Sequence, residues 1–318
     1  MRASASRSAK ITDVKHWVTY PLVHRPYAPE LVTGAAVVEF ARAAEAAGFD
    51  GIGFTDHPAP SDKWLNGGGH DALDPFAALS FVAAVTERVR LIPNILVLPY
   101  RNPFVVAKAI ATIDALSGGR FTANIATGYL KSEYRALGVD FDERNALFDE
   151  ALEVMRGIWT TDAYAYEGLH FTASGASSNP KPERPVPIWI GGNSKLSRRR
   201  VAQKADGWCP FPAPRVLATT AKTLPLETID DLQGMLDELW RYVEGEGRDP
   251  VTIDISFGTS AGGEPGDDDF DGAARQEALA DLASRGVTWV GVSAPHDSLA
   301  HAIEGLQRYG ETVIAPSR

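Results

Sequence analysis

Gly48–His57 has the sequence GFDGIGFTDH, and this stretch decides how the rest of the chain is interpreted. A glycine ends an apolar helix, a short apolar strand follows, and Asp56 and His57 stand directly after that strand. In parallel α/β proteins ligands bind at the carboxyl ends of the strands, because side chains from several strands converge there. We therefore expect Asp56 and His57 to belong to a functional site.

Helix and strand patterns alternate along the whole chain. The predicted helices span 33–47, a segment opened by Asp74-Pro75, 103–116, 144–159, 194–205, 226–243, 272–285 and 297–309. The predicted strands span 14–20, the run inside Gly48–His57, 89–98, 120–127, 185–190, 206–211, 251–257 and 287–292. Eight such pairs favour an α/β fold with a single (β/α)8 TIM barrel over residues 1–318, rather than an open doubly wound sheet.

Three segments depart from this alternation. Residues 160–185 resemble a small hairpin inserted before the fifth strand, and we expect them to help shape the substrate pocket. Residues 258–272 are acidic, glycine-rich and almost free of apolar side chains, which predicts a flexible solvated loop rather than a mobile lid. Residues 1–10 are basic and serine-rich without an apolar run, and we expect a frayed terminus.

Composition restricts the class of partner. The chain has 318 residues and a net charge of -10, which argues against binding to nucleic acid or an anionic membrane and favours a small-molecule partner. No apolar run approaches the roughly 20 residues that span a bilayer. The single cysteine, Cys209, excludes an intrachain disulfide and cysteine-based zinc sites, so we expect no metal and a cytoplasmic protein.

Two glycine-containing strand ends suggest binding sites. Thr127-Gly128-Tyr129 combines a hydroxyl, a residue without a side chain and an aromatic, which suits a flat ring against the backbone as well as it suits a plain turn. Gly191-Gly192-Asn193-Ser194 opens a helix, where backbone amides and the serine hydroxyl could bind a phosphate. The alternative is a serine that only caps the helix, and the sequence leaves both open.

The remaining pocket candidates are aromatic. Residues 93–103 contain three prolines and Tyr100, as a stiff wall beside a cofactor would, although prolines after a strand are also ordinary loop residues. Trp208 lies on the sixth predicted strand and could line the pocket or belong to the core.

Taken in order, the motifs GFDGIGFTDH, NILVLPYRNPFVVAKAIATIDALSGGRF, IATGY, PIWIGGNS and ADGW resemble the bacterial luciferase-like superfamily of flavin- and deazaflavin-dependent oxidoreductases. The resemblance covers roughly residues 31–212 and is closest to the branch that depends on the deazaflavin coenzyme F420. It implies a barrel that holds the cofactor ring at the carboxyl ends of its strands, and a homodimer.

The resemblance also implies roles for individual residues. Asp56 would contact the polar edge of the cofactor, and His57 would lie beside the reacting ring carbon. Asn94-Ile95 matches the position at which family members have a non-prolyl cis peptide bond behind the cofactor ring. The other implied cofactor contacts are Thr127 and Gly128 at the ring, and Gly191, Gly192, Asn193 and Ser194 at the phosphate.

Two positions differ from the family pattern. Some deazaflavin enzymes have a tryptophan shortly after the Asp-His pair, whereas here several residues intervene before Trp64, a candidate for the substrate pocket. Others have a carboxylate after the Thr-Gly pair, where this chain has Tyr129. The proton donor is therefore His57 or Tyr129, and His57 is preferred because imidazole can both donate and abstract a proton near neutral pH.

Three functions are consistent with these features. The first is an F420-dependent oxidoreductase that transfers a hydride to or from an unknown organic substrate. The second is an FMN-dependent monooxygenase supplied with reduced flavin by a separate reductase. The third is a flavin-binding protein without turnover, against which the intact Asp56-His57 pair argues.

Overall fold

The computed structural model describes residues 14–318 and shows an α/β fold with two parallel sheets. In the first sheet the strand order is β11 (Trp289–Val292), β1 (Lys15–Thr19), β2 (Gly51–Phe54) and β3 (Arg90–Pro93). In the second it is β10 (Asp254–Ile255), β9 (Gly207–Cys209), β8 (Ile188–Gly191), β5 (Ala123–Ala126) and β4 (Leu96–Val97). Isolated parallel bridges, Leu91 with Phe121 and Ser256 with Trp289, join the edges of the two sheets.

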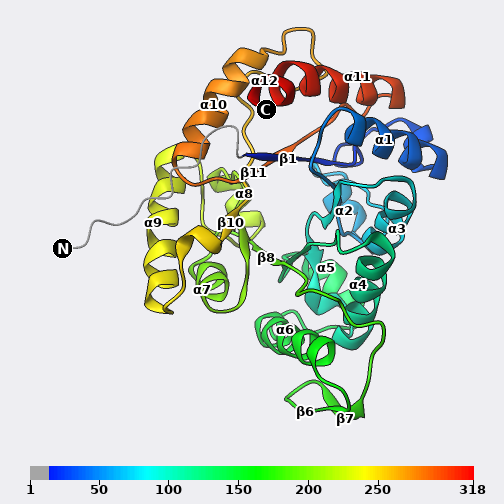
Figure 1. The fold of residues 1–318 in the computed structure, drawn as a ribbon, viewed down its shortest axis with the longest axis vertical. Helices are drawn as coiled ribbons and strands as arrows, with labels where there is room; N and C mark the ends of the chain where they lie inside the picture. Colours follow the sequence, from blue (N-terminus) through cyan, green and yellow to red (C-terminus); the bar gives the residue numbers. More distant parts are fainter. Residues whose placement is uncertain (1–13) are drawn as a thin grey trace.

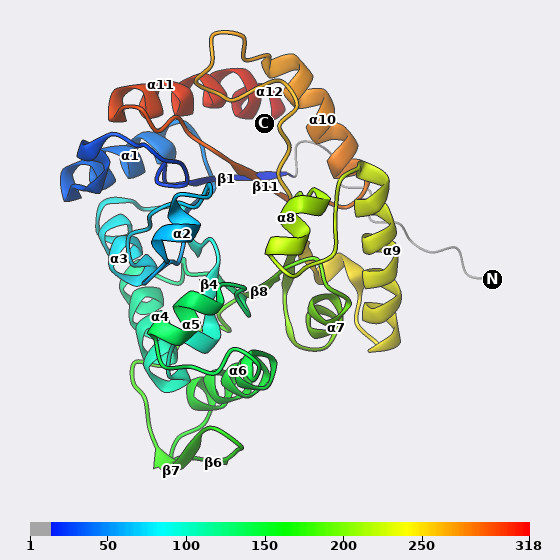
Figure 2. The same ribbon diagram turned by 180° about the vertical axis from the view of Figure 1, so that it is seen from behind.

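The long helices lie outside the strands (Figure 1 and, from behind, Figure 2). They are α1 (Gly34–Ala46), α3 (Pro75–Val85), α4 (Pro103–Ser117), α6 (Arg144–Thr160), α7 (Lys195–Lys204), α9 (Ile229–Gly245), α10 (Gly272–Ser284) and α11 (Leu299–Tyr309). Their ends follow local signals: the Asp74 carboxylate accepts hydrogen bonds from two amides of α3, and Gly118 ends α4 with φ +70°. The predicted alternation of helices and strands is confirmed.

Several short elements were not predicted. They are the helices α2 (Asp62–Leu65), α5 (Lys131–Ala136), α8 (Arg215–Thr220) and α12 (Ala315–Ser317), the 3-10 turns Pro29–Val32, Leu98–Tyr100 and Pro250–Thr252, and a π-helical turn Gly310–Ile314. The helices α2, α5 and α8 each follow a strand of the two parallel sheets, so they lie where the loops can shape a site.

The strands are buried on both faces, as their continuous apolar sequences predict. Ile52, Leu91 and Ile125 face no solvent at all and belong to the main hydrophobic core. Three tryptophans from different strands, Trp17, Trp189 and Trp289, form a separate buried cluster with Ile92. These large buried side chains pack the strands against one another.

The predicted hairpin before the fifth strand is present as the antiparallel pair β6 (Tyr164–Glu167) and β7 (Thr172–Ala176). It lies beyond α6 at one extremity of the molecule (Figure 1), and the Glu150 carboxylate of α6 accepts hydrogen bonds from the His170 and Phe171 amides. None of residues 160–185 lines the main pocket, so the expectation that the hairpin shapes it is wrong. The insertion packs on the outside of a helix, where it cannot reach the strand ends.

The acidic segment 258–272 follows β10 and is held by side chains of the next two helices. Arg275 donates hydrogen bonds to the Ala261 and Gly263 carbonyls, and Arg308 donates to the Asp267 and Phe270 carbonyls. His301 completes the set with a hydrogen bond to the Gly266 carbonyl. The flexibility of this segment stays a prediction, but its backbone has defined anchors.

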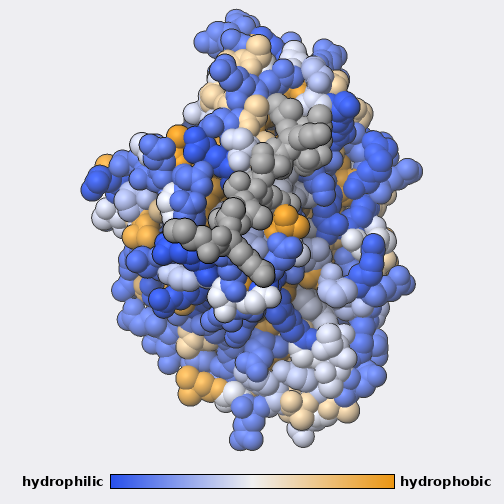
Figure 3. Space-filling model, turned by 60° about the vertical axis from the view of Figure 1, so that its left-hand side comes forward, coloured by the Kyte–Doolittle hydropathy of each residue, from blue (hydrophilic) through white to orange (hydrophobic). Residues whose placement is uncertain are grey.

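The surface view in Figure 3 shows a face that is mostly hydrophilic, with apolar side chains in separate spots. In residues 14–318, no helix combines the length and the apolar character needed to cross a membrane. The predicted frayed terminus, residues 1–10, lies outside the described residues.

Candidate active site

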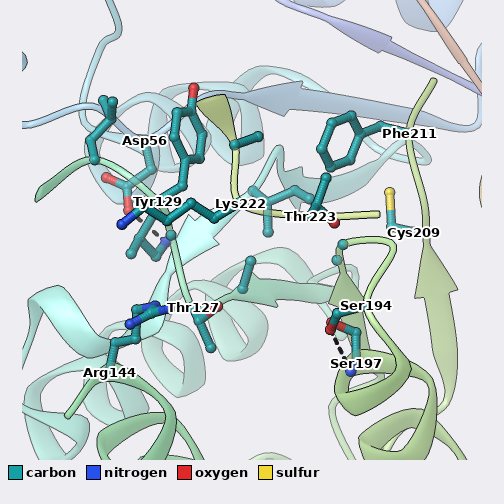
Figure 4. Close-up of a pocket in the computed structure, with 18 of the residues that line it drawn as sticks. Asp56, Thr127, Tyr129, Arg144, Ser194, Ser197, Cys209, Phe211, Lys222 and Thr223 are labelled. Atoms are coloured by element: carbon teal, nitrogen blue, oxygen red, sulfur yellow. Dashed lines mark hydrogen bonds between the residues drawn. The ribbon is translucent and has the colours of Figure 1, made fainter. Parts of the chain in front are cut away.

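A cavity of about 440 Å³ opens at the carboxyl ends of β2, β4, β5 and β8 (Figure 4). Its volume is in the range of small-molecule sites. Most of the site residues predicted from the sequence line it: Asp56, His57, Asn94, Ile95, Tyr100, Thr127, Gly128, Tyr129, Gly191, Gly192 and Ser194. The structure therefore brings together residues that are up to 138 positions apart, although their roles stay predictions.

Two glycines let one wall of the cavity pack closely against Ile95 and Val97. The Asn94–Ile95 peptide is cis, as the family resemblance implies. Gly128 has φ +65°, and a Cβ there would lie 2.5 Å from a methyl group of Val97. A Cβ on Gly191 would lie 2.4 Å from the Ile95 side chain, so a larger residue at either glycine would have to displace this wall.

Asp56 has partners that the sequence did not predict. Its carboxylate accepts two hydrogen bonds of 2.7 Å from the Arg101 guanidinium and one of 2.9 Å from the Val97 amide. The side chain is almost fully buried. Asp56 thus ties the end of β2 to β4 and to the segment that follows it, and its contact with a cofactor stays a prediction.

His57 is paired with a buried carboxylate, Glu133 of α5. The His57 Nδ1 atom lies 3.1 Å from Glu133 Oε2, and Glu133 is fully buried. The Tyr100 hydroxyl donates to the same oxygen at 3.0 Å, and the Ala59 amide donates to Oε1 at 3.2 Å. Because a carboxylate accepts hydrogen bonds, this arrangement places the His57 proton on Nδ1 and leaves Nε2 for a ligand.

Tyr100 and Tyr129 remain protonated at physiological pH. Burial, together with the neighbouring Glu133 charge, raises the pKa of Tyr100 far above its usual value. Burial also raises the pKa of Tyr129, opposed by a hydrogen bond with Trp64. Tyr129 can therefore donate a proton or a hydrogen bond, but it is a poor base.

Trp64 and His70 pack against His57. The His57 ring centre lies 4.4 Å from that of Trp64 and 4.8 Å from that of His70. Trp64 is not among the residues that line the cavity but packs on His57, so its assignment to the substrate pocket stays a prediction. His70 does line it, and burial lowers the His70 pKa. No sequence spacing identified His70, because a glycine-rich loop brings it to the pocket.

The opposite side of the cavity has the features of an anion site. Ser194 caps α7: its Oγ accepts a hydrogen bond from the Ser197 amide at 3.0 Å and lies 2.9 Å from the Ser197 hydroxyl (Figure 4). Both serines line the cavity together with Gly192, and Arg144 lines it on the other side, beside Thr127 (Figure 4). Backbone amides at the start of a ten-residue helix and two hydroxyls are groups that phosphate prefers.

Two predicted residues of this region do not face the cavity. Asn193 is fully buried, and its side chain is hydrogen-bonded to Phe211 and to the Leu224 carbonyl. Trp208 is a core residue whose Nε1 donates to the Gly192 carbonyl at 2.9 Å. Each side chain instead holds the Gly191–Ser194 turn through hydrogen bonds, and the cofactor contact of Asn193 and the pocket position of Trp208 stay predictions.

Arg144 and Lys222 are cavity residues that the sequence analysis missed. Arg144 is the first residue of α6, and its position after the fourth predicted strand was a usable signal. Lys222 lies just after the short helix α8, which no sequence pattern predicted. The arginines that follow Ser194 are engaged elsewhere, Arg198 with Glu238 and Arg200 with Asp149.

In residues 14–318, no group of His, Cys, Asp and Glu side chains is arranged to hold a metal ion. The volume of the cavity and the anion site at Ser194 are compatible with an organic cofactor that carries a phosphate.

Comparison with known proteins supports this interpretation of the cavity. The family model described as luciferase-like monooxygenase matches residues 16–227. An F420-dependent glucose-6-phosphate dehydrogenase of Nocardia farcinica is 34% identical over 194 residues, which cover 59% of this chain and 56% of that relative. The match therefore spans only about half of that enzyme's length.

Two solved structures share the fold over nearly the whole chain. The monooxygenase RslO1 of Streptomyces bottropensis has a TM-score of 0.77 at 17% identity, covering 96% of this chain and 100% of that one. The coenzyme F420-dependent tetrahydromethanopterin reductase of Methanopyrus kandleri has a TM-score of 0.73 at 15% identity, covering 96% and 99%. At these identities the likeness shows the fold alone.

Proposed function

The chain belongs to the luciferase-like monooxygenase family, and from this premise we propose that it is an oxidoreductase dependent on the deazaflavin coenzyme F420. It would transfer a hydride between this cofactor and a small organic substrate. The observation that carries the proposal is one cavity with a glycine wall for a ring and an anion site for a phosphate. The name of the Nocardia farcinica relative favours F420 as the cofactor.

We also propose that the two sheets form one closed (β/α)8 barrel. The two isolated parallel bridges at the sheet edges support this, as does the fold likeness to RslO1 and to the reductase. In this arrangement β3 and β4 are one strand interrupted at Asn94–Ile95. The cavity would then occupy the position where barrel enzymes have their active sites.

The residues of the cavity divide into two groups in this proposal. Gly128, Gly191 and the Asn94–Ile95 peptide would hold the ring, and Ser194 and Ser197 would bind the phosphate. The bound deazaflavin would supply the centre that accepts or donates the hydride. Holding the substrate in line with that centre, and excluding water from it, are the work of the cavity walls.

Proton transfer is assigned to His57. Its Nε2 atom is the free ring nitrogen, and Glu133 and Tyr100 hold the imidazole in one orientation. Glu133 and Tyr100 orient the His57 ring and take no part in the proton transfer itself, since Glu133 only needs to accept the Nδ1 hydrogen bond. Tyr129 would contribute a hydrogen bond to the substrate, because it is protonated at neutral pH.

An FMN-dependent monooxygenase is the second candidate, favoured by the fold likeness to the monooxygenase RslO1. The same ring wall and phosphate site would serve FMN. That function would require a separate reductase to supply reduced flavin.

We further propose a homodimer in the cytoplasm, to be checked by light scattering and by cell fractionation.

The direct test is to mix the purified protein with oxidised F420 and a panel of sugar phosphates and small secondary alcohols, following the loss of deazaflavin absorbance. We expect reduction of F420 with at least one compound, and none when Ser194 and Ser197 are both replaced by alanine. Oxygen-dependent turnover with reduced FMN, and none with F420, would establish the second candidate instead.

A further inference from the structure

Three cationic side chains surround the ring of Phe141. The Arg144 guanidinium lies 3.9 Å from the ring centre, the Lys222 ammonium 4.3 Å and the Lys131 ammonium 4.9 Å. They come from separate segments, the first turn of α6, the connection after α8 and the first turn of α5. We call these three residues the cation cluster.

The cation cluster has no carboxylate partner. Among residues 14–318, no ion pair within 4.0 Å joins Lys131, Arg144 or Lys222 to an acidic side chain. Three acidic residues flank Phe141 in the sequence, Asp140, Asp142 and Glu143, but none forms an ion pair with the cluster: Asp140 accepts a hydrogen bond from the Asp142 amide, and Glu143 lies 3.9 Å from His170. Like charges held together repel each other, so three cations on one ring without an ion-pair partner favour an anionic ligand.

Arg144 and Lys222 of the cation cluster lie across the cavity from the two serines of the anion site (Figure 4). Arg144 and Lys222 line the same cavity as Ser194 and Ser197, whereas Lys131 contacts Phe141 without lining the cavity. Arg144 is half-buried, and both lysines are exposed. A ligand with its phosphate at the two serines would therefore reach the cluster only through a part of the ligand that extends across the cavity.

We propose that Lys131 and Lys222 bind an anionic extension of the cofactor beyond its phosphate. In F420 this extension is the chain of linked glutamates, whose carboxylates match the ammonium groups; FMN ends at its phosphate and offers nothing there. The inference rests on the proposed function and makes the two lysines determinants of cofactor choice. Phe141 fixes the spacing of the cations, since each one packs on its ring.

The test compares three ligands by equilibrium titration of the full chain: F420, the same deazaflavin cut back to its phospholactyl group, and FMN. At about 0.02 M salt we expect F420 to bind more tightly than the shortened form. The difference should shrink at about 0.5 M salt, because exposed charges are screened over a few ångströms there.

Two variants test whether the lysines cause this difference in affinity. Lys131→Ala and Lys222→Ala should each weaken F420 binding about three- to fivefold and leave the shortened form unchanged, as expected for partly exposed charge pairs. Lys15→Ala is the matched control, because Lys15 also packs on an aromatic ring but lies at the amino end of β1, whereas the cavity lies at the carboxyl ends of the strands. This variant should leave the affinities for F420 and for its shortened form unchanged.

The outcomes separate the two proposals. If F420 and its shortened form bind equally, or if both lysine variants weaken both forms alike, the tail site is wrong while the deazaflavin function stands. If neither form binds and FMN does, the proposed cofactor is wrong, and the tail site falls with it.

Discussion

At the scale of single residues, the pairing of His57 with Glu133 defines the proposed chemistry. The sequence placed Asp56 and His57 at a strand end, because an apolar strand followed by polar residues is visible in one short stretch. It could not identify Glu133, which is 76 positions away on a short helix with no amphipathic pattern. Glu133 becomes the partner of His57 only when two loops pack against each other, and no local sequence pattern predicts that contact.

Replacing His57 tests its role in proton transfer. We expect His57→Asn to keep the F420 dissociation constant within about threefold and to lower turnover by about 10²-fold or more, the usual contribution of an acid–base group. The measurement is steady-state turnover with any substrate found in the panel, alongside a cofactor titration. Turnover close to that of the parent chain would remove His57 from the mechanism.

Glu133 acts through His57 and can be tested without a substrate. In the parent chain we expect nitrogen NMR shifts of neutral His57 to report a proton on Nδ1, because the carboxylate can only accept. In Glu133→Gln the amide can also donate to Nδ1, so a population with the proton on Nε2 should appear.

The matched control for this measurement is Glu150→Gln, which alters another buried carboxylate far from His57. It should leave the His57 signals unchanged. Identical His57 spectra in the parent and Glu133→Gln chains would show that Glu133 does not set the proton position.

At the scale of elements, the long helices and the strands were predictable and the short helices were not. Capping residues and glycines mark the ends of α3 and α4 directly in the sequence. The helices α2, α5 and α8 span only four to six residues, too few to show a helical period. They carry or adjoin Trp64, Glu133 and Lys222, so the sequence did not predict where these residues lie relative to the cavity.

The start of α7 is the element on which phosphate binding depends. We expect Ser194→Ala to weaken cofactor binding about tenfold, because it removes one hydroxyl donor to the phosphate and loosens the first turn of the helix. The measurement is the dissociation constant at a temperature well below unfolding. Asp271→Ala is the matched control, since it removes a cap of α10 and Asp271 does not line the cavity; equal affinities in all three chains would count against a phosphate at Ser194.

At the scale of the whole molecule, the alternation of strand and helix patterns indicated an α/β fold with parallel strands, and the position of the insertion was misjudged. The alternation is visible because each buried parallel strand is continuously apolar. The hairpin between α6 and β8 is equally visible, but which side of the molecule it occupies depends on its docking to Glu150 and α6. Sequence order alone therefore assigned it to the wrong surface.

The buried His16 predicts that the folded state loses stability in mild acid. Burial, with the Arg318 and Arg275 charges, lowers the His16 pKa from 6.5 to about 4. Below pH 6.5 the unfolded chain takes up a proton that the folded chain does not, so stability is complete above pH 6.5 and falls between pH 6.5 and 4. We expect a loss of about 2 kcal/mol from this group between pH 7 and pH 5.

Urea unfolding at pH 7 and pH 5 measures this loss, and His16→Gln should reduce the difference between the two pH values. The remaining difference would come from His24 and His70, whose pKa values burial also lowers. An unchanged pH dependence in His16→Gln would mean that His16 is not held neutral in the folded state.

The central claim is that the cavity at the strand ends is built for a deazaflavin. The most direct test is to titrate the purified full chain with F420 and with FMN under identical conditions, following fluorescence quenching. The account predicts saturable F420 binding that is tighter than FMN binding and is weakened by Ser194→Ala. Tight FMN binding with no response to F420 would contradict it.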